Sequence, residues 1–137
     1  MTTHSTNYTN TFIEVADDCP LTTGQVPPIK ADKKTAANLQ FDMVSQHPYK
    51  FTSDDVLFEV YAQKNEIPKR DLHEAREQFF SKGQPCMRAS PLTKRYGWGV
   101  HNDEHGRIAL IARETPEYKK LSKDKHLQVV KAMKSSR

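Results

Sequence analysis

The stretch that decides the fold runs from Trp98 to Ala112 and reads WGVHNDEHGRIALIA. Its two ends are rich in apolar residues, whereas the connection Asn102–Gly106 is polar and closes on a glycine. Two apolar runs joined by a short polar connection with glycine are typical of a β-hairpin, because such residues tolerate the backbone of a tight turn. We therefore expect two antiparallel strands here, and the other elements are assigned outward from them.

Three helices are expected before this hairpin. The first covers residues 35–46 and ends before Pro48, because the residue that precedes a proline avoids the α-helical region. The second covers residues 53–65, where a threonine or serine can cap the first turn and two aspartates favour its positive end. The third covers residues 68–82, with proline suited to its first turn and a glycine after its end.

Apolar side chains recur at helical spacing in the second and third of these helices. Such stripes bury themselves against another element, so we expect the two helices to pack on each other with the hairpin alongside. The predicted contact residues are Val56, Leu57, Val60 and Tyr61 in one helix and Leu72, Ala75 and Phe79 in the other.

The remaining elements are shorter. Residues 11–15 alternate β-branched or aromatic residues with polar ones and predict a strand, followed by an irregular stretch to about Asp32. Residues 86–89 are assigned to another strand. A last helix starts at Thr115 and, from the spacing of its apolar residues, is expected to continue to Met133.

Helices followed by a small antiparallel sheet predict an α+β fold rather than a parallel α/β layer. We expect a single domain over residues 1–137, made of an N-terminal strand and irregular segment (1–33), a helical part (34–82), and a basic hairpin with a C-terminal helix (83–137). Residues 48–112 have the element order of a winged helix, with the hairpin as the wing. This analogy concerns the order of elements and gives no function by itself.

Composition limits the class of protein. The chain has 137 residues, of which 36% are hydrophobic and 28% charged, and it has a mean hydropathy of −0.80. No apolar run approaches the roughly 18 residues of a membrane-spanning helix, and the first residues lack the pattern of a signal peptide. We therefore expect a cytoplasmic protein. Cys19 and Cys86 are far apart in the chain and are expected to be free thiols.

The positive charge is concentrated in the last part of the chain. Residues 83–137 hold twelve basic residues against five acids, a net charge of +7, whereas residues 1–53 and 54–82 carry −1 and −2. Such asymmetry points to an anionic partner, although lysines near a chain end also serve solubility alone.

The segment 83–101 holds the candidate ligand-binding residues. Basic side chains contact phosphates, hydroxyl groups add hydrogen bonds, and aromatic rings stack on bases. Alternatively, the tryptophan and tyrosine pack within the hairpin and the cations are simply solvated. The candidates are Arg88, Lys94, Arg95, Tyr96, Trp98 and His101.

Two other helices bear on nucleic-acid binding. Residues 69–82 would be the recognition helix of a winged helix, but four cations there are offset by three acids, which disfavours contact with phosphates. The last segment, residues 119–137, carries seven basic residues interleaved with apolar ones. Its helix is the better candidate, together with the hairpin. Its apolar stripe can equally pack on the domain and leave the lysines in solvent.

Catalytic and metal sites have weak support. Cys86 with His101 is the one plausible pair of nucleophile and base, and a thiol beside Arg88 or Lys94 would have a lowered pKa. His101, Asp103 and His105 lie near one turn, but flexible turns rarely hold three ligands, and the spacings of known metal motifs are absent. We predict no metal and no cofactor, and binding is favoured over catalysis.

Three longer stretches resemble an uncharacterised bacterial family, domain of unknown function 6157. They are residues 10–20 (NTFIEVADDCP), residues 48–58 (PYKFTSDDVLF) and the run 79–101, which contains SKGQPCMRASPLTKRYGWG at 81–99. The likeness covers nearly the whole chain. It implies no activity and transfers no site residue, because the family has no assigned activity.

The sequence therefore predicts a non-catalytic module that binds a polyanion, in the first place nucleic acid, through the segment from Arg88 to Trp98. Two alternatives stay open. One is a small thiol-dependent enzyme or sensor centred on Cys86, and the other is a protein–protein adaptor whose basic face meets an acidic partner.

Overall fold

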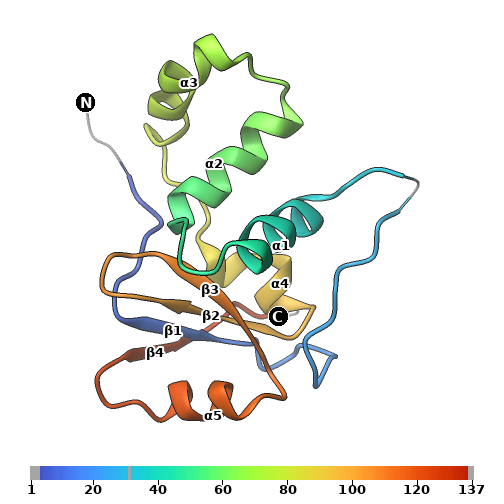
Figure 1. Cartoon of the computed structure of the whole chain (residues 1–137), viewed down its shortest axis with the longest axis vertical. Coiled ribbons are helices and arrows are strands. Elements are labelled where there is room, and N and C mark those ends of the chain that lie inside the picture. Colours follow the sequence, from blue (N-terminus) through green and yellow to red (C-terminus); the bar gives the residue numbers. More distant parts are fainter. Residues whose placement is uncertain (1–3, 31, 136–137) are drawn as a thin grey trace.

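The computed structural model describes residues 4–30 and 32–135, which form a four-stranded sheet with helices on both faces (Figure 1). The sheet order is β3-β2-β1-β4, in which β3 and β2 are antiparallel, β2 and β1 are antiparallel, and β1 and β4 are parallel. The strands are β1 (Thr11–Glu14), β2 (Trp98–Asn102), β3 (Ile108–Ala112) and β4 (Gln128–Lys131).

The predicted hairpin is confirmed as β2 and β3. Trp98 lies opposite Ala112 and Asn102 opposite Ile108. The carboxylate of Asp103 closes the turn by accepting the backbone N–H groups of His105 and Arg107 at 2.8 and 2.9 Å. Gly106 has φ +78°, the left-handed backbone that favours glycine, so the turn chemistry seen in the sequence fixes the register.

The three expected helices precede the hairpin and are confirmed as α1 (Ala36–Gln46), α2 (Ser53–Lys64) and α3 (Leu72–Phe79), the last preceded by a 3-10 turn at Lys69–Asp71. Reciprocal caps fix the first two. The Thr52 hydroxyl accepts the N–H of Asp55 at 3.2 Å, and the Asp55 carboxylate accepts the N–H of Thr52 at 3.1 Å. Two shorter helices follow, α4 (Pro91–Lys94) and α5 (Pro116–Ser122).

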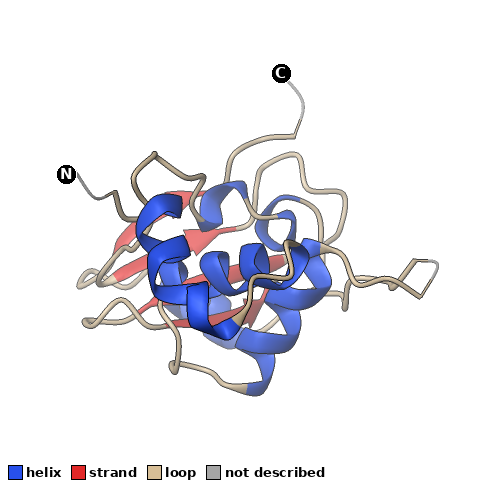
Figure 2. Ribbon diagram, turned by 90° about the horizontal axis from the view of Figure 1, so that it is seen from above, coloured by secondary structure: helices blue, strands red, loops and turns tan. Residues whose placement is uncertain are grey.

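The main core lies between one face of the sheet and α1 together with the first turn of α2. Figure 2 shows helices packed over the strands. Ile13 and Val100 from the sheet meet Val44 of α1 and Val56 of α2, and all four are buried. The α+β class predicted from the order of elements is therefore correct. The winged-helix resemblance of residues 48–112 stays a prediction.

A second core lies on the opposite face of the sheet, where α5 packs. Phe12 and Ile111 meet Leu121, and the Tyr118 hydroxyl accepts the backbone N–H of Val15 at 2.8 Å. A Cβ at Gly99 would lie only 2.7 Å from the Phe12 ring and 2.8 Å from the Tyr118 ring. The absence of a side chain at this position lets α5 approach the sheet.

A third apolar cluster joins α2 to α3, which project from the body of the molecule (Figure 1). Phe58 and Ala62 of α2 meet Phe80, while Tyr61 keeps 40% of its surface exposed and rests on Phe79 with ring centroids 4.6 Å apart. The predicted packing of the two helices is thus partly correct: Val56 faces the main core instead, and Phe58 makes the inner contact.

Two predicted elements are wrong. Residues 86–89 are not a strand, because Met87–Ala89 form a 3-10 turn that leads into α4. The last helix ends at Ser122, and the residues expected to extend it form β4. In β4, Val130 packs on the main core and Val129 on the second core, so this segment buries apolar residues on both faces of the sheet.

Within the part of the chain that the structure describes, no helix is both long and apolar enough to cross a membrane.

Candidate functional site

The aromatic residues of the 83–101 segment are packed rather than presented to a ligand. The ring of Trp98 lies against Phe41, with centroids 5.4 Å apart, and its Nε1 donates to the carbonyl of Gln25 at 2.8 Å. A Cβ at Gly24 would be 3.0 Å from the same ring. Tyr96 is half-buried, and its carbonyl accepts the N–H of Gln25 at 2.9 Å. Both residues hold the loop around Gln25 on the sheet.

The three basic residues of the 83–101 segment differ in whether their side chains already have a hydrogen-bond partner. Arg88 Nε donates to the carbonyl of Lys131 at 2.7 Å, and the carbonyl of Arg88 accepts the N–H of Met133 at 2.8 Å. This residue therefore ties the C-terminal strand to the body of the protein. Lys94 and Arg95, at the end of α4, form no hydrogen bond or ion pair through their side chains with any described residue.

Cys86 and His101 lie on opposite faces of the sheet. Cys86 lies on the same side as α1 and α2, where it lines a small hollow with Gln40 of α1 and Leu57 of α2. His101 follows Val100, which faces the main core, so its side chain points to the other face. The structure does not bring this thiol and imidazole together, and the Cys86 and Cys19 thiols are both free.

Each of these two residues has a tyrosine partner that the sequence analysis missed. The Cys86 sulfur lies 3.6 Å from the hydroxyl of Tyr8, whose pKa is raised mainly by burial. The Tyr49 hydroxyl lies 2.8 Å from Nδ1 of His101, with the rings nearly perpendicular at 84°. Both tyrosines are distant in the chain from their partners. Tyr49 belongs to the stretch 48–58 that resembles the family. This resemblance draws attention to Tyr49 but does not identify His101 as its contact.

The pair of Tyr49 and His101 combines an unusual backbone with an imidazole whose pKa is lowered. Tyr49 has φ +60°, a left-handed conformation that is rare for a bulky residue. Burial lowers the pKa of His101 from its ordinary value of 6.5, although the carboxylates of Asp103, Glu117 and Asp124 act in the opposite direction. The lowered pKa favours the neutral imidazole, and which atom of the Tyr49–His101 pair donates the hydrogen bond depends on the tautomer of the ring.

The turn after β2 does not assemble metal ligands. His105 points to Glu104 at 3.5 Å, and His101 to Tyr49. Among the described residues, no group of three or more His, Cys, Asp or Glu side chains is placed to hold a metal ion.

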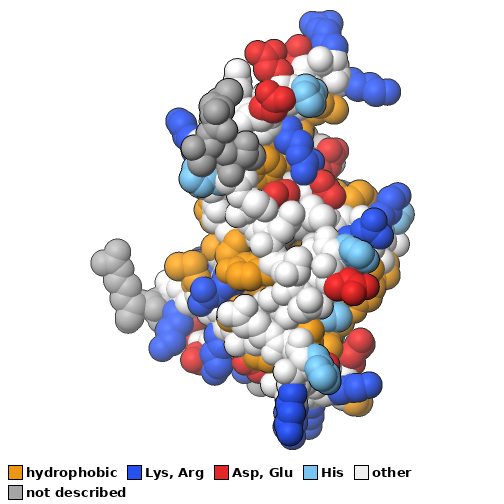
Figure 3. Space-filling view, turned by 90° about the vertical axis from the view of Figure 1, so that its left-hand side faces the viewer, with side chains coloured by type: hydrophobic (Ala, Val, Ile, Leu, Met, Phe, Trp, Pro, Cys, Tyr) orange, Lys and Arg blue, Asp and Glu red, His pale blue; other side chains and the backbone are white. Residues whose placement is uncertain are grey.

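Exposed lysines gather on α5 and the turn that follows it. Tyr118 and Leu121 face the sheet, and the lysines between and after them are exposed and form no ion pair with described residues. Figure 3 shows Lys and Arg side chains at the lower end of the molecule, at the level of α5 in Figure 1. We call this set the α5 lysine surface: Lys119, Lys120, Lys123 and Lys125.

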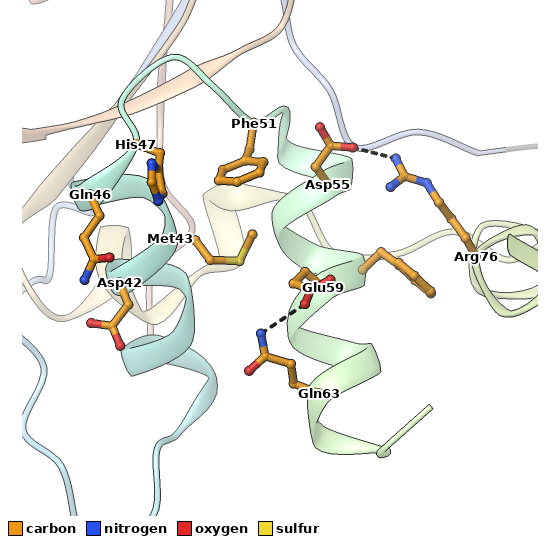
Figure 4. A pocket seen from close by; sticks show the side chains of 10 residues that line it. Asp42, Met43, Gln46, His47, Phe51, Asp55, Glu59, Gln63 and Arg76 are labelled. Atoms are coloured by element: carbon orange, nitrogen blue, oxygen red, sulfur yellow. Dashed lines mark hydrogen bonds and ion pairs between the residues drawn. The ribbon is translucent and has the colours of Figure 1, made fainter. Parts of the chain in front are cut away.

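A groove of about 600 Å³ lies between α1 and α2, and Arg76 of α3 also lines it (Figure 4). Its apolar lining comes from Met43, Phe51 and Phe58, and its carboxylates from Asp42, Asp55 and Glu59. We call it the α1–α2 groove. The groove could not be predicted from the sequence, because its lining residues come from three helices and the connection between α1 and α2, and follow no common motif.

Comparison with known proteins places the chain in one family. The model of a family described as "Family of unknown function (DUF6157)" matches residues 3–137, so the chain belongs to this family. The resemblance seen in the sequence is therefore confirmed. The search of curated proteins and the search of solved structures found no match to this chain.

Proposed function

Because the family to which the chain belongs has no known function, we propose from the chain's own surface that it is a non-catalytic module that binds a polyanion, in the first place nucleic acid. The α5 lysine surface makes the main contact. Four lysines fall within seven residues, with one aspartate among them, so the segment 119–125 carries a net charge of +3.

The observation that carries this proposal is that all four lysines are exposed and lack a carboxylate partner among the described residues. An ammonium group that already has an ion-pair partner must break that pair to bind a phosphate. A lysine without one releases condensed counterions from the nucleic acid at no such cost.

The packing of Trp98 and Tyr96 favours binding to the phosphate backbone over recognition of bases. Bases are read or stacked by exposed aromatic and polar side chains, whereas lysines contact phosphates without regard to sequence. We therefore propose binding that depends on the phosphate backbone and is indifferent to sequence. Lys94 and Arg95 are proposed as a secondary phosphate contact. Since α4 and α5 lie on different faces of the sheet (Figure 1), these two side chains are not part of the α5 lysine surface.

Fluorescence anisotropy with labelled 20-nucleotide DNA and RNA tests the proposal, at salt concentrations from about 50 to 200 mM. Replacing Lys119, Lys120, Lys123 and Lys125 by Gln should weaken binding about tenfold or more and reduce the slope of log affinity against log salt by about 3 to 4. The matched control replaces four exposed lysines elsewhere, Lys30, Lys33, Lys64 and Lys69, by Gln and changes the net charge equally.

The control separates a local contact from a general effect of charge. An equal loss in both quadruple variants would contradict an interface at α5, since only total charge would then matter. If the unaltered protein shows no salt-dependent binding to DNA, RNA or heparin even at low salt, the polyanion proposal is wrong.

A further inference from the structure

The α1–α2 groove combines an apolar floor with carboxylates along its walls. Met43 and Phe51 are half-buried and point into the space between the two helices, as Figure 4 shows. Asp55 and Glu59 are four residues apart on α2 and so lie on one face of that helix. A volume of about 600 Å³ falls within the range of small-molecule sites.

Two carboxylates that line the groove are already paired with cations of the chain. Arg76 Nη2 lies 2.9 Å from Asp55, and the guanidinium carbon lies 5.8 Å from the ring centroid of Phe58 and 5.5 Å from that of Phe80. At the other wall, Lys34 Nζ lies 2.7 Å from Asp42. Each pairs a cation with a carboxylate, and the first also sets the cation over aromatic faces.

Glu59 differs from the other two carboxylates. Its Oε1 accepts a hydrogen bond from the Gln63 amide at 3.2 Å, and it has no cationic partner among the described residues. It is half-buried and lies beside the apolar floor of the groove. A positive group here would meet an uncompensated carboxylate at its charged end and apolar side chains along its body.

We propose that the α1–α2 groove binds a small organic cation, an ammonium group on an aromatic or aliphatic body, with Glu59 as the carboxylate that receives the charge. Met43 and Phe51 contact the apolar body. This site is separate from the α5 lysine surface, which lies on the other face of the sheet (Figure 1).

The test uses tryptamine as the probe, with tryptophol as a neutral compound of similar size and indole-3-propionate as an anionic one. Protein labelled with ¹³C in its methionine methyl groups reports the site directly. Met43 lines the groove, whereas Met87 is buried in the core and Met133 is exposed elsewhere, so the latter two are internal controls.

Tryptamine should shift the Met43 methyl signal saturably at roughly millimolar concentrations, and the neutral and anionic compounds should bind at least about fivefold more weakly. Glu59→Gln should weaken tryptamine binding about fivefold, whereas Glu74→Gln, at an exposed position on α3, should leave it unchanged. Arg76→Gln removes a competing positive charge and should tighten binding by a similar factor.

Equal affinity for the three compounds would overturn the proposal, as would an affinity for tryptamine that Glu59→Gln leaves unchanged. So would shifts of equal size at Met43, Met87 and Met133, or no saturable shift up to about 10 mM. An unchanged Met87 signal in each variant shows that the core is intact, so a loss of binding is then assigned to the groove. None of these outcomes depends on whether the protein binds nucleic acid.

Discussion

The hydroxyl of Tyr49 lies 2.8 Å from Nδ1 of His101, across 52 positions of the chain. The backbone N–H of Tyr49 donates to the carbonyl of Ile108 at 2.9 Å, which places the segment after α1 along the outer edge of β3. The phenol then reaches His101 on the α5 face of the sheet. One side chain thus fastens the connection between α1 and α2 to the strand pair.

Replacing Tyr49 by Phe should lower the free energy of unfolding by about 1 kcal/mol, because the ring is kept while the hydrogen bond to His101 is lost. Urea denaturation followed by circular dichroism measures the difference. Tyr61→Phe is the control, since Tyr61 is similarly exposed and packs on Phe79 through its ring. Equal effects of the two substitutions would contradict a specific role for the Tyr49 hydroxyl.

His101 should make the stability of the protein depend on pH. Its pKa is lower in the folded protein than the ordinary value of 6.5, so the unfolded chain binds the proton more tightly. The free energy of unfolding should therefore rise as pH increases through the range below 6.5 and level off above it.

The difference between the unaltered protein and His101→Gln isolates this contribution from that of other titrating groups. Urea denaturation at a series of pH values should show the two curves converging toward acid and separating toward neutral pH. A constant difference across that range would show that His101 has the same pKa in the folded and unfolded chain.

Gly99→Ala should destabilise the protein by about 1 to 3 kcal/mol, because the added methyl group would overlap the rings of Phe12 and Tyr118. Gly83→Ala is the matched control, since a Cβ there meets no atom within 4 Å. Thermal unfolding of both variants measures the effect. An unchanged melting temperature for Gly99→Ala would mean that α5 does not pack closely on the sheet.

Replacing both Lys94 and Arg95 by Ala should weaken nucleic-acid binding by a smaller factor than the quadruple change in α5, and to the same extent for all sequences. These side chains make no ion pair with described residues, so the variant should keep its circular dichroism spectrum. Anisotropy with two unrelated DNA sequences checks the prediction. A loss confined to one sequence would instead indicate base recognition near α4.

Local chemistry in the sequence determined the hairpin and the first three helices. The polar turn before Gly106 and the reciprocal cap of Thr52 and Asp55 involve residues within a few positions of each other. Interactions of this range form without regard to the rest of the fold, which is why their positions could be predicted.

Residues 127–133 show where the sequence alone was insufficient. Their apolar spacing suits a helix, but the backbone of this segment pairs in parallel with β1, more than a hundred residues earlier, and fills a core on each face of the sheet. As a strand this segment buries apolar side chains on both faces of the sheet, whereas as a surface helix it would bury only one stripe of them.

The residues available for binding were likewise determined partly by the sequence and partly by the tertiary structure. Composition and charge determined that an excess of cations lies in the last part of the chain. The tertiary structure decided that Arg88 holds Lys131 and that the loop around Gln25 covers Trp98. It also decided that the α5 lysines have no ion-pair partner among the described residues. The physical reason is that availability depends on which partners the fold brings within hydrogen-bonding distance, and these partners are distant in the sequence.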